Sequence, residues 1–250
     1  MEDTFPVVSE KFSMLPSEFL RSGFFGLSTA LCDDDVSESY PIYDWESVDV
    51  KLREQCVTLS GPRLNQYHKR VLLGLISRAS GQKNDATMVI NPAEFLEFIG
   101  RSACSRNVAA LKRSLTHLSR AQVNIKRYAH DGRNRFTFLR SVSVDKGRME
   151  IQMSPAFAEV LWWRGSTRIP LPSRLPLPDG FSTALIDLFR ACRTHVYYIS
   201  ALSAIWQREP VQFGREITVA MKVLHTAGLL ASYDRRRGKI LVVTKEPWMV

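Results

Sequence analysis

The sequence predicts an α+β fold of two similar lobes that follow an acidic N-terminal arm. Helical periodicity alternates with short β-rich runs along residues 51–165, and the same order of patterns returns along residues 166–250. Residues 1–50 show no such order and are rich in acidic residues and proline. The 250 residues, 45% of them hydrophobic, suffice for two domains of ordinary size.

The arm, residues 1–50, is expected to contain little regular structure. Three prolines interrupt it, and the run Asp33-Asp34-Asp35 repels itself. A short helix is expected near Ser17 to Phe25, where phenylalanines gather. We expect these phenylalanines to pack the arm onto the body as an ordered strap; a docking peptide for another protein is the alternative.

In the first lobe the patterns predict helices separated by one short strand and followed by a hairpin. The expected elements are extended segments at Val50–Leu52 and Val57–Leu59, a helix that starts at Gly61-Pro62 and carries Leu64 to Ile76, a strand over Thr87–Ile90, a helix from Pro92 to Ile99, a helix after Ser105, strands at Gln122–Tyr128 and Phe136–Val144, and a closing alternation at Met149–Met153. Asn91 is a helix cap, and Val108, Leu111, Leu115 and Leu118 share one helical stripe.

The second lobe repeats this order after a proline-rich linker, Ile169 to Pro178. Its expected elements are a helix over Ser182–Arg193, a short strand at Val196–Ile199, a brief helix from Ser200, a third helix that Gly228 ends, and strands at Leu230–Tyr233 and Lys239–Thr244. Helix, strand, helix, helix and hairpin is the order of a winged helix, a helix-turn-helix with a β-wing. We therefore predict two tandem winged-helix domains, residues 51–165 and 166–250.

Charge points to a polyanionic partner. The chain has 34 Lys and Arg against 25 Asp and Glu, a net charge of +9. Residues 1–50 hold 11 acidic and two basic residues, a balance of −9 that leaves +18 on the remaining 200 residues. Nucleic acid is the commonest partner for such a surplus. An anionic membrane surface is the other candidate, but the chain contains no clean basic amphipathic helix with bulky apolar anchors.

The third helix of each lobe carries the candidate DNA-binding residues, because in a winged helix this element lies in the major groove. On the first, no acid occurs between Arg101 and Arg127, and the cations expected opposite the leucine stripe or beside it are Arg106, Lys112, Arg113, His117 and Arg120. On the second, one face is expected to present Arg215, Thr218, Lys222 and His225. A solvated basic face without a ligand is the alternative for either helix.

The hairpin tips are the second candidate contact with DNA. Arg133 and Arg135 lie in the loop Ala129–Arg135, which we take as the first wing. The second wing concentrates four cations, Arg235, Arg236, Arg237 and Lys239. A hairpin has no folding need for such a cluster, so contact with the phosphate backbone or the minor groove is expected, more firmly for the second wing.

Signatures of catalysis and of cofactors are missing from the sequence. It contains no P-loop, dinucleotide-binding glycine motif, HExxH or nucleophile elbow, so we expect no enzyme, no catalytic residue and no cofactor. Four dispersed cysteines form no CxxC pair and the histidines form no ligand pair, so neither a metal site nor disulfides are expected. Tyr197-Tyr198 resembles the paired tyrosines of nicking replication enzymes, which also need a histidine-held metal; we expect core residues instead.

Several phrases together resemble plasmid replication initiators of the TrfA type. They are Leu15 to Ser22, Ser60-Gly61, Leu73-Gly74-Leu75 with Ser80-Gly81-Gln82, Leu111 to Leu118, Leu177-Pro178-Asp179-Gly180, Leu188-Phe189 and Leu224 to Leu229. The resemblance runs from about residue 15 to the C-terminus, and it rests on the order and spacing of these phrases.

The resemblance implies a non-enzymatic initiator that binds tandem direct repeats, called iterons, at a plasmid origin. Such proteins help to open an adjacent A·T-rich element, where single-stranded DNA becomes a further partner, and they recruit the host replicative helicase and sliding clamp. In that family monomers bind the origin, and dimers formed largely through the first domain inhibit. Ser22 to Gly26 shares only the aromatic end of the family's clamp-binding peptide.

Two rival functions remain at this point. A winged-helix transcriptional regulator would bind a palindrome as a stable dimer, whereas a nicking enzyme would form a covalent tyrosyl–DNA adduct. No stretch approaches the roughly 20 apolar residues of a membrane span, and the N-terminus lacks a secretion signal, so a bacterial cytoplasmic location is expected.

Overall fold

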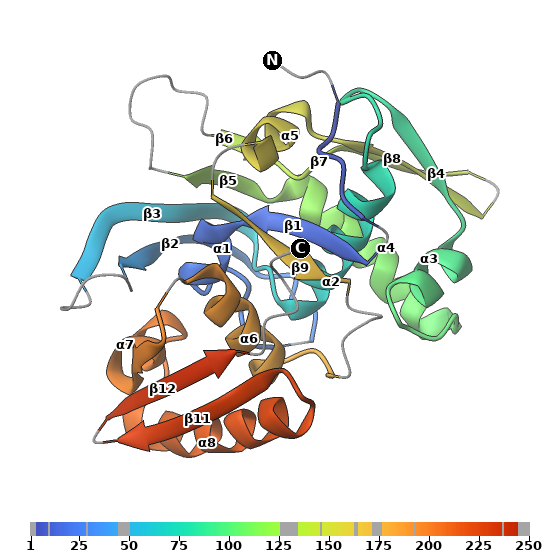
Figure 1. The fold of residues 1–250 in the computed structure, drawn as a ribbon. Coiled ribbons are helices and arrows are strands. Elements are labelled where there is room, and N and C mark those ends of the chain that lie inside the picture. The colour runs from blue at the N-terminus through green and yellow to red at the C-terminus, as the bar shows by residue number, and fades with distance from the viewer. Residues whose placement is uncertain are drawn as a thin grey trace.

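The computed structural model of the chain describes residues 4–9, 11–28, 30–44, 51–125, 135–145, 147–162, 165–171, 177–192, 194–236 and 238–244. It has two lobes, each with its own hydrophobic core (Figure 1). The larger lobe contains the blue to yellow part of the chain, and the smaller lobe contains the orange and red part. No helix of the described residues is long and apolar enough to cross a bilayer.

The larger lobe surrounds its core with helices and three small sheets. Its elements are β1 (Phe12–Pro16), α1 (Ser17–Arg21), β2 (Asp35–Asp44), β3 (Lys51–Pro62), α2 (Gln66–Ala79), β4 (Thr87–Ile90), α3 (Pro92–Phe98), α4 (Ser105–Arg120), β5 (Gln122–Ile125), β6 (Arg135–Thr137), β7 (Leu139–Asp145), β8 (Arg148–Met153), α5 (Pro155–Trp162) and β9 (Ser166–Pro170). The strand orders are β2-β3-β5-β6, β4-β8-β7 and β1-β9.

Local capping explains where two of these helices begin. The Asn91 side chain accepts a hydrogen bond from the Ala93 N–H and caps α3, with Pro92 in the first turn, as predicted. The helix expected from Gly61-Pro62 starts later, because these residues end strand β3 and Asn65 caps α2. Asn65 accepts from two backbone N–H groups of the first turn, which satisfies donors that the helix itself cannot.

The smaller lobe has the winged-helix order that the sequence predicted. Its elements are α6 (Phe181–Ala191), β10 (Val196–Tyr198), α7 (Ile199–Ile205), α8 (Pro210–Thr226), β11 (Leu230–Arg236) and β12 (Lys239–Thr244). Its sheet has the order β10-β12-β11: the strand after the first helix lies at one edge and pairs with the second strand of the hairpin. The sheet β4-β8-β7 of the larger lobe has the same arrangement. Two tandem winged-helix domains are therefore confirmed.

This shared sheet order corrects the position of the first wing. The hairpin equivalent to β11–β12 is β7–β8, not the strands on either side of residues 129–135. The run Phe136–Val144, expected as one strand, is divided at Phe138, whose side chain is fully buried in the larger core. Before this point β6 pairs with β5, and after it β7 pairs with β8.

The described part of the N-terminal arm is folded onto the larger lobe. Phe19, Phe24 and Phe25 are buried in its core, and the rings of Phe19 and Phe24 stack at 4.7 Å between centroids. Strand β1 pairs antiparallel with β9, which lies beyond the predicted domain boundary at 165/166. The sequence did not predict β2, because acids and Pro41 obscure its alternation; it pairs with β3.

Buried charges join the two lobes. Lys69 Nζ on α2 lies 2.6 Å from Asp187 on α6, with side-chain exposures of 4% and 1%. Arg70 Nε on α2 lies 2.6 Å from Asp179, which also accepts from Arg101 at 2.5 Å. Charged groups this deeply buried are tolerated only when paired, so these contacts fix how the lobes sit against each other.

Candidate nucleic-acid interface

Helix α8 of the smaller lobe packs one face against the core and presents the other to solvent. We call α4 and α8 the recognition helices, because each is the second helix of a helix-turn-helix. Phe213, Ile217 and Leu224 of α8 are fully buried. The predicted readers lie on the remaining surface: Arg215, Lys222 and His225 are exposed, and Thr218 is half-buried. Neither Arg215 nor Lys222 forms an ion pair with a described residue.

The second wing lies against the same side of α8. Arg235 Nη1 of β11 donates to the Gly214 carbonyl at 2.9 Å and to Thr218 Oγ1 at 2.5 Å. A Cβ on Gly214 would lie 3.0 Å from the Arg235 guanidinium, so glycine allows this close approach. The sequence did not reveal this role of Gly214. The His225 and Tyr233 rings also meet, at 5.8 Å between centroids, so helix and wing form one surface.

Arg236 and Lys239, the other described cations of this wing, are exposed, and each has one contact. Arg236 Nε lies 2.6 Å from an oxygen of Asp234, and the Lys239 ammonium lies 4.8 Å from the centroid of the Tyr198 ring. Both contacts are at the surface, where exchange with a phosphate costs little. Arg237 lies outside the described residues.

Helix α4 presents cations too, but an acidic segment lies against part of them. Arg106 and Lys112 are exposed, as predicted. Arg113 donates to both carboxylate oxygens of Asp33, from Nε at 2.5 Å and from Nη2. Arg120 Nη2 donates to Asp35 Oδ2 at 2.8 Å. The hydrogen bond from Arg113 lowers the pKa of Asp33, with a smaller contribution from His117.

His117 is not on the exposed face of α4, where the sequence was expected to place it. Its side chain is buried at the edge of α4, next to the leucine stripe. His117 Nε2 lies 2.9 Å from Asp33 Oδ1, and Nδ1 lies 3.0 Å from His68 Nε2. With both rings neutral, His117 donates to Asp33 and accepts from His68, which in turn accepts from the Asn65 N–H at 3.1 Å.

Burial accounts for the protonation state of His68. Burial, together with the nearby His117 and Arg113, lowers its pKa to about 3. The ring is therefore neutral at physiological pH, which suits its place between α2 and α4. The two imidazole rings also stack, with 5.1 Å between centroids. His117 acts here as a positioning group between the acidic segment and the core.

The corrected first wing changes which cations belong to it. Arg133 lies outside the described residues, and Arg135 stands on β6, where Nη2 donates to the Gln122 side chain. Strands β7 and β8 instead carry Arg140 and Arg148, both exposed and without an ion pair to a described residue. The sequence signal that could have placed this wing is Asp145-Lys146-Gly147, a turn between two alternating runs.

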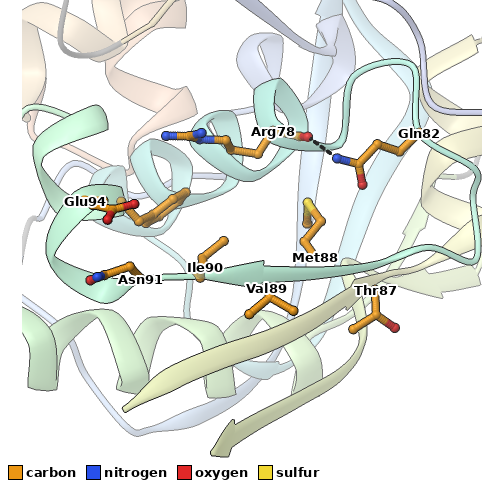
Figure 2. A pocket seen from close by; sticks show the side chains of 9 residues that line it. Arg78, Gln82, Thr87, Met88, Val89, Ile90, Asn91 and Glu94 are labelled. Atoms are coloured by element: carbon orange, nitrogen blue, oxygen red, sulfur yellow. Dashed lines mark hydrogen bonds between the residues drawn. The ribbon is translucent and has the colours of Figure 1, made fainter. Parts of the chain in front are cut away.

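A hollow of about 320 Å³ lies apart from both recognition helices (Figure 2). It lies between the end of α2, strand β4 and the start of α3, with Arg78, Gln82 and Glu94 at its rim. The Arg78 guanidinium lies 4.4 Å from the centroid of the Phe98 ring. The backbone carbonyl of Arg78 accepts a hydrogen bond from the Gln82 side chain. None of the predicted DNA-binding residues lines this hollow, so it does not belong to the interface.

The groups that a nicking enzyme would need are placed unfavourably. Tyr197 is buried, as predicted for a core residue, and its hydroxyl donates to the Thr194 carbonyl at 3.0 Å. Burial raises the pKa of this hydroxyl. Tyr198 is half-buried beneath Lys239. In the part of the chain that the structure describes, no three His, Cys, Asp or Glu side chains gather in a way that could hold a metal ion.

Comparison with known proteins agrees with this architecture. Two crystal structures of domains 2 and 3 of RctB share the fold at 10% sequence identity. One has a TM-score of 0.58 and covers 93% of this chain and 99% of that chain, and the other has a TM-score of 0.55 and covers 89% and 95%. Among curated proteins, no relative matches. Residues 50–169 match the family described as initiator replication protein, WH1. This match covers the larger lobe from β3 to β9.

Proposed function

We propose that this protein is a replication initiator that binds tandem direct repeats at a plasmid origin and acts without enzymatic activity of its own. In this proposal it promotes opening of an adjacent A·T-rich element, contacts the resulting single strand and recruits the host helicase and sliding clamp. The family match supports the general role in initiation. The common fold of the two lobes supports binding to repeated rather than single sites, because each lobe carries a recognition helix and a wing.

One observation supports DNA binding by the smaller lobe above all others: the cations of α8 and of its wing form a continuous exposed surface. Arg235 reaches from the wing to Thr218 while Arg215 and Lys222 remain open beside it. A helix in the major groove with a wing on the adjacent backbone needs this arrangement. We assign base contacts to Arg215 and Lys222, and we assign to Thr218 the positioning of Arg235.

The remaining cations are assigned to the phosphate backbone. Arg236, Arg237 and Lys239 would hold phosphates next to the repeat that α8 reads. The larger lobe would add a contact through Arg106, Lys112, Arg113 and Arg120, the last two after leaving their carboxylates. Arg135 is assigned a weaker backbone contact, because it stands on β6 rather than on the wing.

The clamp contact needs a site other than the one suggested by the resemblance. Phe24 and Phe25, the aromatic end of Ser22 to Gly26, are 0% and 3% exposed. A clamp-binding peptide inserts its aromatic residues into the clamp, which these two residues can do only if they leave the core. We therefore place the contact elsewhere in the chain.

An electrophoretic mobility shift assay tests the proposed function. Duplexes from the origin region of the plasmid that encodes the chain are compared with versions in which the repeats are direct, inverted or scrambled. Tighter binding to direct repeats by at least about 4 kcal/mol over scrambled DNA is expected for a specific complex. Binding as a stable dimer to inverted repeats would instead identify a transcriptional regulator, and equal binding to all duplexes would contradict the proposal.

A further inference from the structure

The exposed face of α8 carries valines between its cations. Among the described residues, seven large apolar side chains are exposed, and three of them are on this helix. Val211, Val219 and Val223 have exposed fractions of 69%, 63% and 39%. Together with Arg215 they occupy positions spaced by four residues, which form a single row along the helix.

Folding alone does not explain valine at these positions. A β-branched side chain loses rotamer freedom in a helix, so alanine or a charged residue would form the helix more readily. Val211 and Val219, both more than 60% exposed, also bury little apolar area in return. On α4, by contrast, the exposed positions are polar, charged or alanine. The valine row therefore belongs to the function of α8 rather than to its stability.

We propose that Val219, with Val211 and Val223, contacts thymine methyl groups in the major groove and thereby selects thymines within the repeat. This inference rests on the proposed function, because it assigns sequence readout to the helix that we place in the groove. The thymine C5-methyl is the apolar group exposed in the major groove, and apolar side chains recognise it by contact. Arginine and lysine at the same surface would read guanines or hold phosphates.

Charge favours DNA over a protein chain as the occupant of this row. Arg215 lies within the row, and Lys222 lies next to Val219 and Val223 on the same face, with no carboxylate of the described residues paired to either cation. The acidic residue of α8, Glu216, lines a hollow together with Val219 at one side of the row, and its side chain accepts a hydrogen bond from Gln212 at 3.3 Å. Apolar groups interspersed with open cations match the major groove, where methyl groups lie between acceptors and phosphates.

Replacing thymine by deoxyuracil tests the proposal, since this change removes only the C5-methyl group. The full-length protein first selects duplexes from a random pool, and each thymine of the selected site is then replaced in turn. At one or more positions we expect the wild-type affinity to fall about fourfold, as for the loss of one buried methyl group. In Val219→Ala the same replacement should have no further effect, because the methyl has already lost its contact.

Control variants separate this contact from general damage. Val7→Ala removes an even more exposed valine, 81% exposed, from the larger lobe and should bind every duplex as the wild type does. Val219→Ala should unfold at the wild-type temperature or above it, because alanine favours the helix. A variant that binds weakly and also unfolds earlier would be replaced by Val219→Ser, which removes both γ-methyl groups of the valine.

Three results would overturn the inference or the function beneath it. If the protein selects a sequence but deoxyuracil changes the affinity at no position, the valines do not read thymine, and the proposed function is unaffected. If Val219→Ala leaves DNA binding intact and abolishes self-association in sedimentation equilibrium, the row is a protein interface. If the wild-type protein selects no sequence at all, the proposed function itself is wrong.

Discussion

The two recognition helices occupy the same place in the same order of elements, but their cations have different neighbours. On α4, Arg113 and Arg120 are paired with Asp33 and Asp35, carboxylates that are about 80 residues away in the sequence. On α8, Arg215 has no such partner among the described residues. The N-terminal acids therefore neutralise part of one helix and leave the other open. The difference shows that a basic helix face is not by itself an available one.

The geometry of the Asp33 contact shows that DNA can bind Arg113 of α4 only by displacing this carboxylate. Arg113 holds both oxygens of the carboxylate, in the fork-like arrangement that arginine also forms with a phosphate. A phosphate would have to take the place of Asp33, whereas α8 can meet DNA without breaking an internal ion pair. We therefore expect the smaller lobe to dominate affinity.

The largest predicted effect concerns the buried ion pair between Lys69 and Asp187, which joins the two lobes and thereby fixes the positions of α4 and α8 relative to each other. In Asp187→Asn, Lys69 and Arg190 lose the carboxylate that they share at 2.6 and 3.1 Å. Breaking a buried pair in this way should lower the free energy of unfolding by about 3–5 kcal/mol, measured by urea denaturation. Asp145→Asn, at the exposed end of β7, is the matched control and should change it by less than about 0.5 kcal/mol. A small effect of Asp187→Asn would mean that the Asp179 ion pairs and apolar packing join the lobes without it.

The second prediction tests directly whether α8 dominates readout. Lys222→Ala should cost about 1–3 kcal/mol of binding at the selected site and little on random DNA, because it removes a base contact. Arg120→Ala removes the same charge from α4, but this arginine is already paired with Asp35. Its effect should be smaller and similar on both kinds of DNA. Equal losses in the two variants, measured by fluorescence anisotropy, would abolish the distinction between the helices.

The third prediction uses the buried histidine beneath α4, which has no counterpart on α8, where His225 is exposed. The pKa of His68 is lowered from 6.5 to about 3, so the unfolded chain takes up a proton at a higher pH than the folded chain. The free energy of unfolding should therefore fall as the pH drops from 6.5 towards 3, by up to about 1.4 kcal/mol per pH unit. Urea unfolding of the wild type and of His68→Gln between pH 7 and 4 measures the slope of the free energy of unfolding against pH. An unchanged slope in the variant would show that other groups titrate instead.

Local patterns predicted the parts of this molecule that local interactions determine. Asn91 with Pro92 marked a helix start, and Arg215, Lys222 and His225 of α8 are exposed on the face where their spacing placed them. The pairing of Asp33 with Arg113 could not be predicted, because it depends on how β2 joins the sheet. His117 was misplaced because the buried face of α4 is wider than its leucine stripe and includes Ser114.

The first wing was misplaced for a related reason. Two hairpins follow α4 in sequence, and both alternate apolar and polar residues. Only the partner strand distinguishes them: β8 pairs with β4, which lies between the first two helices of the domain, whereas β5 pairs with β3. Pairing between distant strands leaves no periodic signal in either strand, so the sequence alone favoured the hairpin nearer to α4.

The smallest predicted effect tests the comparison itself. Asparagine has nearly the shape of aspartate. Asp33→Asn and Asp35→Asn therefore remove only the negative charges that face Arg113 and Arg120. Both pairs are exposed, and exposed ion pairs contribute little to stability, so we expect each variant to unfold nearly as the wild type does. Affinity for DNA should rise by roughly twofold to fivefold, because phosphate no longer has to displace an acid.

Salt dependence distinguishes this gain from a general change in charge. If freed arginines of α4 reach phosphates in the Asp33→Asn/Asp35→Asn variant, the slope of log affinity against log salt should steepen by about one to two counterions. Asp85→Asn changes the charge by one unit away from α4 and should leave the slope as it is. If the double variant binds with wild-type affinity and slope, then α4 does not approach DNA. The acidic segment would then act only as a brace for His117, and the larger lobe would contribute structure rather than contact.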